Sequence, residues 1–232
     1  MTSEIRRAIN KWVFQAALGV IGYGTIIFLA AGTTRWVWGW MLLIVVTAVM
    51  AAHPLLLIPI NPELLAEREK GVLDEGVKRW DKWINMGAGT MMMVTWVVAG
   101  LDVRLGWTAN WPLAAHLAGL LFNILGYALF MWSMTANAFF AEGVRIQTER
   151  GHTVATDGPY RFVRHPGYVG AITANLATPV LLGSWWAFLP AVVLAVLYIL
   201  RTALEDRTLQ AELPGYVEFT RQTRFRLLPG VW

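Results

Sequence analysis

Residues 167–204 read GYVGAITANLATPVLLGSWWAFLPAVVLAVLYILRTAL, which is two apolar runs separated by Gly183 and Ser184. A helix rises about 1.5 Å per residue, so roughly 20 apolar residues cross the ~30 Å hydrocarbon core of a bilayer. The runs at about 167–183 and 185–204 are therefore predicted to be membrane helices. Because only a tight turn joins them, we expect a helical hairpin.

Four further apolar runs lie closer to the N-terminus, so the sequence predicts an all-α integral membrane protein with about six transmembrane helices. The first run is too long for a cleaved signal peptide, and no cleavage site followed by a polar mature chain comes after it. The last of the four is long enough to extend beyond the bilayer. The four expected spans cover about 12–31, 36–60, 84–101 and 111–141.

The composition agrees with a membrane location. Of the 232 residues, 56% are hydrophobic and 15% are charged, against about 25% charged in soluble domains. Thirteen tryptophans suit the boundary between bilayer and water. The chain has no cysteine, which excludes disulfides, iron–sulfur clusters, thiolate zinc sites and a cysteine nucleophile. With only four histidines, we expect no metal site.

The basic residues predict the orientation in the membrane. Seventeen Lys and Arg lie in the N-terminal segment, the loops at 61–83 and 142–166, and the tail, whereas Arg35 and Arg104 alone lie in the opposite connections. Cytoplasmic loops carry the excess of positive charge, so both termini and the active site are expected to be cytoplasmic. In a bacterium the protein would lie in the inner membrane. The net charge of +4 is assigned to these loops, and no nucleic-acid partner is expected.

No repeat or linker divides the chain, so residues 1–232 are expected to form one domain. Within it, 1–110 would hold the N-terminal helices and an amphipathic loop, and 111–232 the catalytic core. The 61–83 loop is predicted to contain one or two amphipathic surface helices. The tail at 203–222 has a helical pattern that can lie against the membrane.

Polar chemistry is concentrated in the stretch RIQTERGHTVATDGPYRFVRHPGY, residues 145–168. Its Gly and Pro residues prevent a long helix, so an ordered loop that leads into the fifth membrane helix is expected. Pro166 can begin that helix. The helix N-terminus and Arg164 would favour an anionic group nearby. The alternative is an ordinary membrane anchor, with Arg and Tyr side chains among lipid headgroups.

A second polar cluster begins with Arg201 and Glu205, which share one face of the sixth helix because they are four positions apart. Charges at the end of an apolar segment are costly unless they are paired or face a polar cavity, which makes this pair a functional candidate. The alternative is an Arg that reaches the lipid surface and a solvated Glu. The hairpin would bring Glu205 near His165 and Tyr168, where it could hold a cationic or polyhydroxylated ligand.

The stretch HTVATDGPYRFVRHPGYVG at 152–170 resembles the signature of integral-membrane S-adenosylmethionine methyltransferases, namely the isoprenylcysteine carboxyl methyltransferases and their phospholipid-methyltransferase relatives. The tail, with Glu205-Asp206 and Pro214-Gly215-Tyr216, resembles the C-terminal block of the same family. The resemblance covers about 145–229. The N-terminal half resembles the family only in topology and in NPELLAER at 61–68.

The resemblance implies S-adenosylmethionine as cofactor and S-adenosylhomocysteine as product. It implies that Arg201 binds the methyl-accepting group. Two positions depart from the family pattern: Arg145 stands where the eukaryotic carboxyl methyltransferases carry Gln, and Asp206 replaces the second Glu of a Glu-Glu pair. The expected cofactor-binding residues are Arg145, His152, Thr153, Val154, Ala155, Tyr160, Arg164, His165, Pro166, Gly167, Tyr168 and Glu205.

The expected reaction is methyl transfer to a hydrophobic or lipid-like acceptor, with a prenylcysteine-type carboxylate as the first expectation. A carboxylate needs no base, and Arg201 could orient it through two hydrogen bonds. A phospholipid amine or a thiol is the next candidate acceptor; it must lose a proton, which His165 or Glu205 could accept. An NADPH-dependent isoprenoid or sterol reductase, or a non-catalytic lipid-binding protein, would also be compatible with the pattern. Membrane lipids are expected partners, and the oligomeric state is left open.

Overall fold

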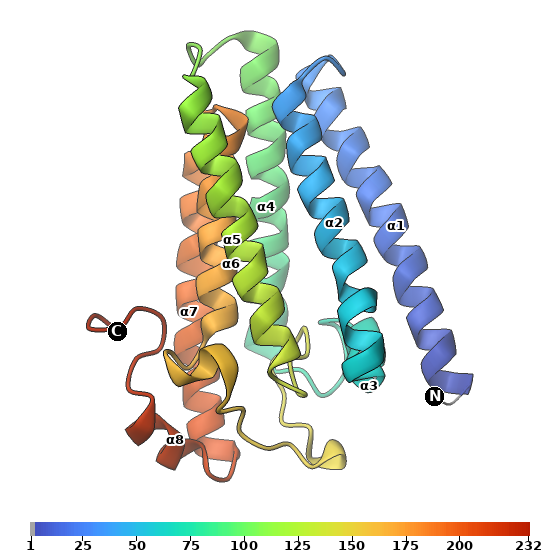
Figure 1. Ribbon diagram of the computed structural model, residues 1–232, viewed down its shortest axis with the longest axis vertical. Helices are drawn as coiled ribbons and strands as arrows, with labels where there is room; N and C mark the ends of the chain where they lie inside the picture. Colours follow the sequence, from blue (N-terminus) through green and yellow to red (C-terminus); the bar gives the residue numbers. More distant parts are fainter. Residues whose placement is uncertain (1–2) are drawn as a thin grey trace.

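The computed structural model describes residues 3–232, and long helices packed side by side make up most of it (Figure 1). No strand occurs within this range, so the predicted all-α class is confirmed. A short helix follows α2 and another follows α7. The helices are α1 (Ser3–Ala31), α2 (Val37–Ile60), α3 (Pro62–Glu69), α4 (Arg79–Leu105), α5 (Leu113–Thr135), α6 (Pro166–Leu182), α7 (Phe188–Glu212) and α8 (Tyr216–Gln222).

Each of the six expected spans corresponds to one long helix. Five of these helices, namely α1, α2, α4, α5 and α7, are long and apolar enough to cross a membrane. The helix α6 has 17 residues, which makes it shorter than the other five. A sixth span therefore remains a prediction for α6.

Helix α5 ends at Thr135, so the expected extension of this run to residue 141 is wrong. The chain turns at Asn137, whose side-chain Oδ1 accepts a hydrogen bond from the backbone N–H of Phe139 at 2.9 Å. Such Asn turns compete with helix formation. Hydrophobicity alone had suggested continuation, because the turn lies among apolar residues.

The structure can be compared with the predictions for the 61–83 loop and for the tail at 203–222. The 61–83 region contains one short helix, α3, and the next long helix already begins at Arg79. The tail is helical as expected: α7 continues to Glu212, and α8 follows.

A tight turn joins α6 and α7, which confirms the predicted hairpin. Gly183 ends α6 with φ of 72°, a left-handed conformation that glycine adopts without strain. Ser184 then accepts a hydrogen bond at its side-chain oxygen from the backbone N–H of Ala187 at 3.2 Å. This bond fixes the start of α7, three positions later than expected.

Glycines allow α5 and α6 to pack backbone against backbone. A Cβ on Gly126 would lie 2.5 Å from the backbone nitrogen of Ala174, and one on Gly170 would lie 2.5 Å from the carbonyl oxygen of Gly126. Asn123 donates a hydrogen bond to the Ala174 carbonyl at 2.8 Å. Small residues and interhelical amide bonds are the usual means of close helix packing in membranes.

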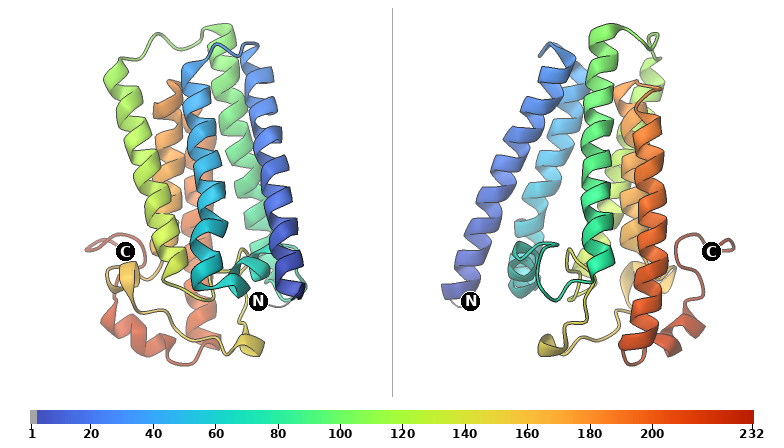
Figure 2. Two further views of the ribbon diagram at one scale, coloured as in Figure 1. Left: turned by 45° about the vertical axis from the view of Figure 1, so that its right-hand side comes forward. Right: turned by 180° about the vertical axis from the view of Figure 1, so that it is seen from behind.

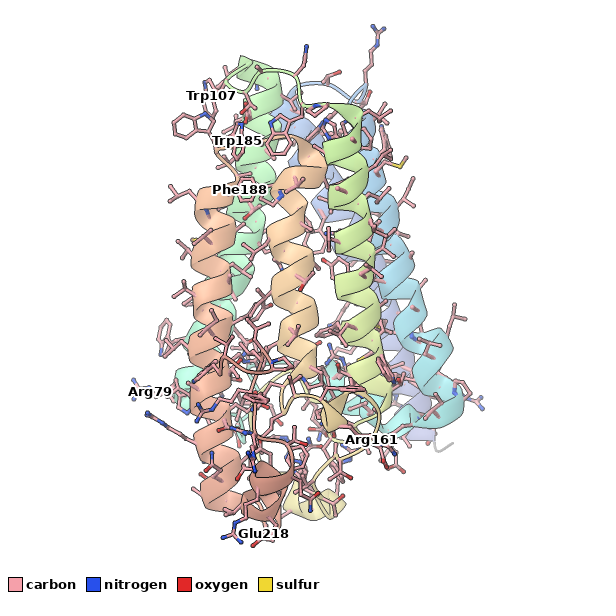
Figure 3. All side chains as sticks on the ribbon, turned by 60° about the vertical axis from the view of Figure 1, so that its left-hand side comes forward. Arg79, Trp107, Arg161, Trp185, Phe188 and Glu218 are labelled. Atoms are coloured by element: carbon pink, nitrogen blue, oxygen red, sulfur yellow. The ribbon has the colours of Figure 1, made fainter. Side chains whose placement is uncertain are left out.

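The two ends of the bundle differ in chemistry. Trp107, Trp185 and Phe188 lie at one end, and Arg79, Arg161 and Glu218 lie toward the other (Figure 3). The N-terminus, α3, α8 and the long loop between α5 and α6 gather at the charged end (Figure 2). This arrangement places the two polar clusters of the sequence at the same end of the bundle.

Candidate active site

A cavity of about 270 Å³ lies at the charged end, between the α5–α6 loop, the first turn of α6 and the second half of α7. It brings together twelve of the thirteen site residues expected from the sequence. The exception is Pro166, which is buried in the first turn of α6. The twelve are Arg145, His152, Thr153, Val154, Ala155, Tyr160, Arg164, His165, Gly167, Tyr168, Arg201 and Glu205.

Tyr168 and Glu205 meet across the hairpin in the cavity wall. The Tyr168 hydroxyl donates a hydrogen bond to one carboxylate oxygen of Glu205. The other oxygen of Glu205 has no hydrogen-bond partner within residues 3–232, although the side chain lines the cavity. The site therefore contains a carboxylate with one oxygen available to a cationic or hydroxyl-bearing ligand.

The loop 152–155 forms a second wall. The His152 ring stacks on Phe139 with ring centres 4.5 Å apart, and its Nδ1 accepts a hydrogen bond from the backbone N–H of Gln147 at 3.2 Å. Burial, followed by the positive charges of Arg145 and Arg150, lowers the pKa of His152 from 6.5 to about 4. His152 is therefore neutral at pH 7.

The backbone that follows His152 is available for hydrogen bonding. Within the described chain, the backbone N–H and C=O groups of Thr153, Val154 and Ala155 make no hydrogen bond to other backbone groups. All three residues line the cavity. Thr153 is exposed, and Val154 and Ala155 are partly exposed. Their backbone groups therefore form an accessible polar edge that a ligand with donors and acceptors can contact.

Aromatic side chains form a third part of the cavity wall. Tyr160, Tyr216, Phe219 and Leu213 are buried together in one apolar cluster, and all four line the cavity. Burial raises the pKa of the Tyr160 phenol, so this hydroxyl stays neutral. The cluster supplies aromatic and apolar surface to the same cavity as the polar edge of 153–155.

Arg164 and His165 point toward Asp206, and this differs from the expectation for Arg164. Its guanidinium donates to both Asp206 oxygens at 2.7 and 3.1 Å, and to the carbonyls of Thr223 and Arg224 at 3.0 and 2.6 Å. The His165 Nε2 lies 3.3 Å from one Asp206 oxygen. The attraction expected between Arg164 and an anionic ligand is thus directed to a carboxylate of the protein.

Arg201 is paired with Asp81 on α4, and like Glu205 it lines the cavity, so the two charges on this helix face are accommodated as expected. Its guanidinium donates to the two Asp81 oxygens at 2.6 and 3.1 Å and to the Glu142 carbonyl at 2.6 Å. It also lies 5.3 Å from the ring centre of Tyr168. Arg201 is 8% exposed, which rules out a side chain that extends to the lipid surface.

Arg145 connects the loop to α3 and the segment after it. Its guanidinium pairs with Glu67, and it lies 2.8 Å from a Glu149 oxygen and 3.8 Å from an Asp74 oxygen. These carboxylates, chiefly through the hydrogen bond to Glu67, raise the pKa of Arg145 despite burial. Acidic groups of the protein therefore surround this cation.

Sequence reasoning missed several polar residues of the site. Asp81 is fully buried, although the sequence places it in the 61–83 segment that is predicted to form amphipathic surface helices. Asp81 bonds Arg201, which lines the cavity, whereas Arg68 and Glu142 line the cavity themselves. Only the NPELLAER stretch carried a signal for Arg68, and the others depend on contacts between distant parts of the chain.

Known proteins share features with this chain. Residues 118–211 match the model of the isoprenylcysteine carboxyl methyltransferase (ICMT) family. The cobalt-zinc-cadmium resistance protein CzcN of Cupriavidus metallidurans is 29% identical over 144 residues. The match covers 57% of this chain and 58% of that relative, so the likeness spans little more than half of either protein.

The fold is similar to that of the eukaryotic intramembrane Ras methyltransferase ICMT. The TM-score is 0.53 at 14% sequence identity, and the match covers 100% of this chain and 99% of that one. The family match and the shared fold confirm the resemblance to ICMT-like integral-membrane methyltransferases. With five apolar helices, they indicate an integral membrane protein.

Proposed function

We propose that this protein transfers a methyl group from S-adenosylmethionine to a lipid-like acceptor, and that the acceptor is a prenylcysteine-type carboxylate. The observation that carries the proposal is the Tyr168–Glu205 contact beside the loop 152–155 in one cavity. The family match at 118–211 supports the reaction class. In this proposal residues 1–232 act as one domain, with the core at 111–232 and the active site and both termini on the cytoplasmic side.

The residues present suit the chemistry of the cofactor. The free Glu205 oxygen can accept hydrogen bonds from an ammonium group or from ribose hydroxyls. The unpaired backbone edge at 153–155 can contact the polar rim of adenine, and Tyr160 and Phe219 can pack against its ring. When bound, S-adenosylmethionine supplies an electrophilic methyl group on a sulfonium.

The protein's contribution is to align the acceptor and exclude water. Arg201, held by Asp81, can orient a carboxylate, which is already anionic and loses no proton when an oxygen gains the methyl group. The sulfur keeps the electron pair of the broken C–S bond, so charge balances without a base. The buried aromatic cluster around Tyr216 adds apolar wall to the same cavity, which helps to exclude water.

An amine or thiol acceptor fits less well. It requires a base, and the His165 Nε2 lies 3.3 Å from both Asp206 and the Tyr216 hydroxyl. The Nε2 of His165 is therefore directed toward Asp206 and Tyr216 in the interior of the protein. Glu205 remains as a base, but the proposal already assigns it to the cofactor.

A dinucleotide reductase also fits less well. NADPH carries several phosphate groups, which call for free cations. Among the arginines of the cavity, Arg164 is engaged by Asp206 and acidic side chains surround Arg145. The other two, Arg68 and Arg201, each already contact a carboxylate of the protein, which leaves little positive charge for several phosphates. The donor set around 152–155 and Glu205 suits a ligand with a positive charge better than one with phosphates.

Calorimetric titration of the purified protein in detergent tests the proposal. We expect binding heat with S-adenosylhomocysteine and none with NADPH, and we expect Glu205→Ala to abolish the heat. Glu218→Ala is the matched control, because Glu218 is an exposed carboxylate on α8. The proposal would be overturned if NADPH gave binding heat and S-adenosylhomocysteine gave none. It would also be overturned if Glu205→Ala bound S-adenosylhomocysteine as well as the wild type does. Transfer of a radiolabelled methyl group to N-acetyl-S-farnesylcysteine then tests the acceptor class.

A further inference from the structure

Arg68 is a buried cation in the cavity wall whose hydrogen bonds are incomplete. It lies on α3, is 8% exposed and lines the cavity. Its Nη1 donates to the Phe140 carbonyl and its Nη2 to a Glu142 carboxylate oxygen, each at 3.2 Å. Its Nε is buried and has no partner within residues 3–232. A buried donor without a partner is costly, which indicates a site prepared for a ligand.

Arg201, on α7, contacts the same residue, Glu142. Its Nη2 donates to the backbone carbonyl of Glu142 at 2.6 Å, whereas Arg68 contacts the Glu142 side chain. The Nη1 of Arg201 has no hydrogen-bond partner in the part of the chain that the structure describes. The guanidinium groups of Arg68 and Arg201 therefore both contact Glu142, and each has one nitrogen without a hydrogen-bond partner in the described chain, Nε in Arg68 and Nη1 in Arg201.

The electrostatics of this position favour an additional anion. Burial lowers the pKa of Arg68, and the positive charge of Arg201 lowers it further, while Glu142 opposes both effects. Arginine nevertheless stays protonated in proteins. The two cations therefore repel each other, and a second negative charge between them would relieve that repulsion.

Glu142 is suited to give way to such an anion. Its side chain is 33% exposed, and the Arg68 contact at 3.2 Å is its single ion pair within residues 3–232. Because its side chain is a third exposed, the Glu142 carboxylate can be solvated when it leaves Arg68, whose charge the incoming anion would then pair. Asp81, by contrast, is fully buried and holds Arg201 through two bonds. One carboxylate is therefore fixed and the other can be displaced.

Building on the proposed function, we propose that Arg68 and Arg201 together bind the carboxylate of the acceptor, which displaces the Glu142 side chain from Arg68. The position explains why this anion is the reacting group. Arg201 lies against the ring of Tyr168, and the hydroxyl of that ring bonds Glu205. A single aromatic ring separates the anion site from the carboxylate assigned to the cofactor. A phospholipid phosphate held there would leave its amine displaced from the methyl group.

Steady-state kinetics with N-acetyl-S-farnesylcysteine, together with competition by its carboxamide, test the assignment. For Arg68→Gln we expect KM to rise roughly 10- to 100-fold, as for loss of a charged hydrogen bond, while kcat at saturation and S-adenosylhomocysteine affinity stay within about threefold. The variant should also lose the wild-type preference for the carboxylate over the carboxamide. Arg68→Lys should recover part of the low KM and part of the preference for the carboxylate. Glu142→Gln should lower KM several-fold, because it removes the carboxylate that competes for Arg68.

Lys70→Gln is the matched control, because Lys70 is a half-exposed cation two positions from Arg68 that pairs with Glu67 outside the cavity. Binding of S-adenosylhomocysteine by each variant shows that the cavity is folded. If the wild-type protein methylates the carboxylate but Arg68→Gln behaves like Lys70→Gln, this inference alone fails. If phosphatidylethanolamine in vesicles is methylated and the carboxylate is not, the acceptor assignment fails. If the wild-type protein binds no S-adenosylhomocysteine, the proposed function fails with it.

Discussion

Glu205 and Asp206 are neighbours on α7, and the structure uses their carboxylates in opposite ways. Asp206 is fully buried and accepts hydrogen bonds from Arg164, Arg226, Gln210 and the Tyr216 hydroxyl. Glu205 accepts one hydrogen bond, from Tyr168, and faces the cavity. Successive positions on a helix point about 100° apart, so one side chain enters the protein interior and the other the cavity.

The comparison shows that a cluster of polar residues can contain two separate systems. The Asp206 system joins the loop before α6 to the C-terminal tail, because Arg164 also binds the carbonyls of Thr223 and Arg224. In the Glu205 system, by contrast, one carboxylate oxygen has no hydrogen-bond partner within residues 3–232. A saturated carboxylate indicates a structural role, and an unsaturated one beside a cavity indicates a ligand.

Asp206→Ala should have the largest effect. It leaves Arg164 buried without its partner, and breaking a buried ion pair in this way costs about 3–5 kcal/mol. We expect a large drop in the unfolding midpoint in detergent, and loss of ligand binding because the loop is released. Asp206→Asn keeps the size and should be milder. A midpoint unchanged in Asp206→Ala would remove the structural half of the comparison.

Glu205→Ala should show the reverse pattern. Removing a charged acceptor of ligand hydrogen bonds costs about 1.5–3 kcal/mol of binding, a loss of roughly 10- to 150-fold in S-adenosylhomocysteine affinity. The unfolding midpoint should stay close to that of the wild type, because Tyr168 is the only group that loses a partner within residues 3–232. If the midpoint fell as far as in Asp206→Ala, the two carboxylates would share one structural role.

Lowering the pH should destabilise the folded protein through His152, which lines the cavity with Glu205. Its pKa is lowered from 6.5 to about 4 in the folded protein, so between these values the unfolded chain binds more protons than the folded one. Stability therefore falls as the pH decreases from 6.5 toward 4. The unfolding midpoint across this range should depend less on pH in His152→Gln, which cannot titrate. An identical pH dependence in both proteins would show that His152 is not responsible.

The smallest effect is expected for Arg161→Ala. Arg161 pairs with Asp157, but the two side chains are 70% and 79% exposed, and such surface pairs contribute about 0–1 kcal/mol. Arg164, three positions later, is buried against Asp206. Arg164→Ala measured beside Arg161→Ala should give a far larger drop in the unfolding midpoint. Equal drops would show that burial does not decide the contribution of an arginine here.

Hydrophobic run length predicted the helices well, and local motifs located most of the cavity wall. The loop 145–168 is continuous in sequence, so its residues were recognisable together. The partner of Arg201 was not predictable, because Asp81 lies 120 positions away and looked like one charge among several in a surface loop. The end of α5 was missed because the Asn137 turn interrupts an apolar run without a Gly or Pro.

If α6 crosses the bilayer as the sequence predicts, its shortness has a consequence for the surrounding lipid. With 17 residues it spans about 26 Å, a few Å less than the usual hydrocarbon thickness. Bilayers adapt to such a mismatch by local thinning. Headgroups and water would then dip toward the first turn of α6, where Gly167 and Tyr168 line the cavity. Under the proposed function, a prenyl chain could stay dissolved among the acyl chains while its polar end reaches the reacting position. The proposed substrate would then not have to be extracted from the membrane.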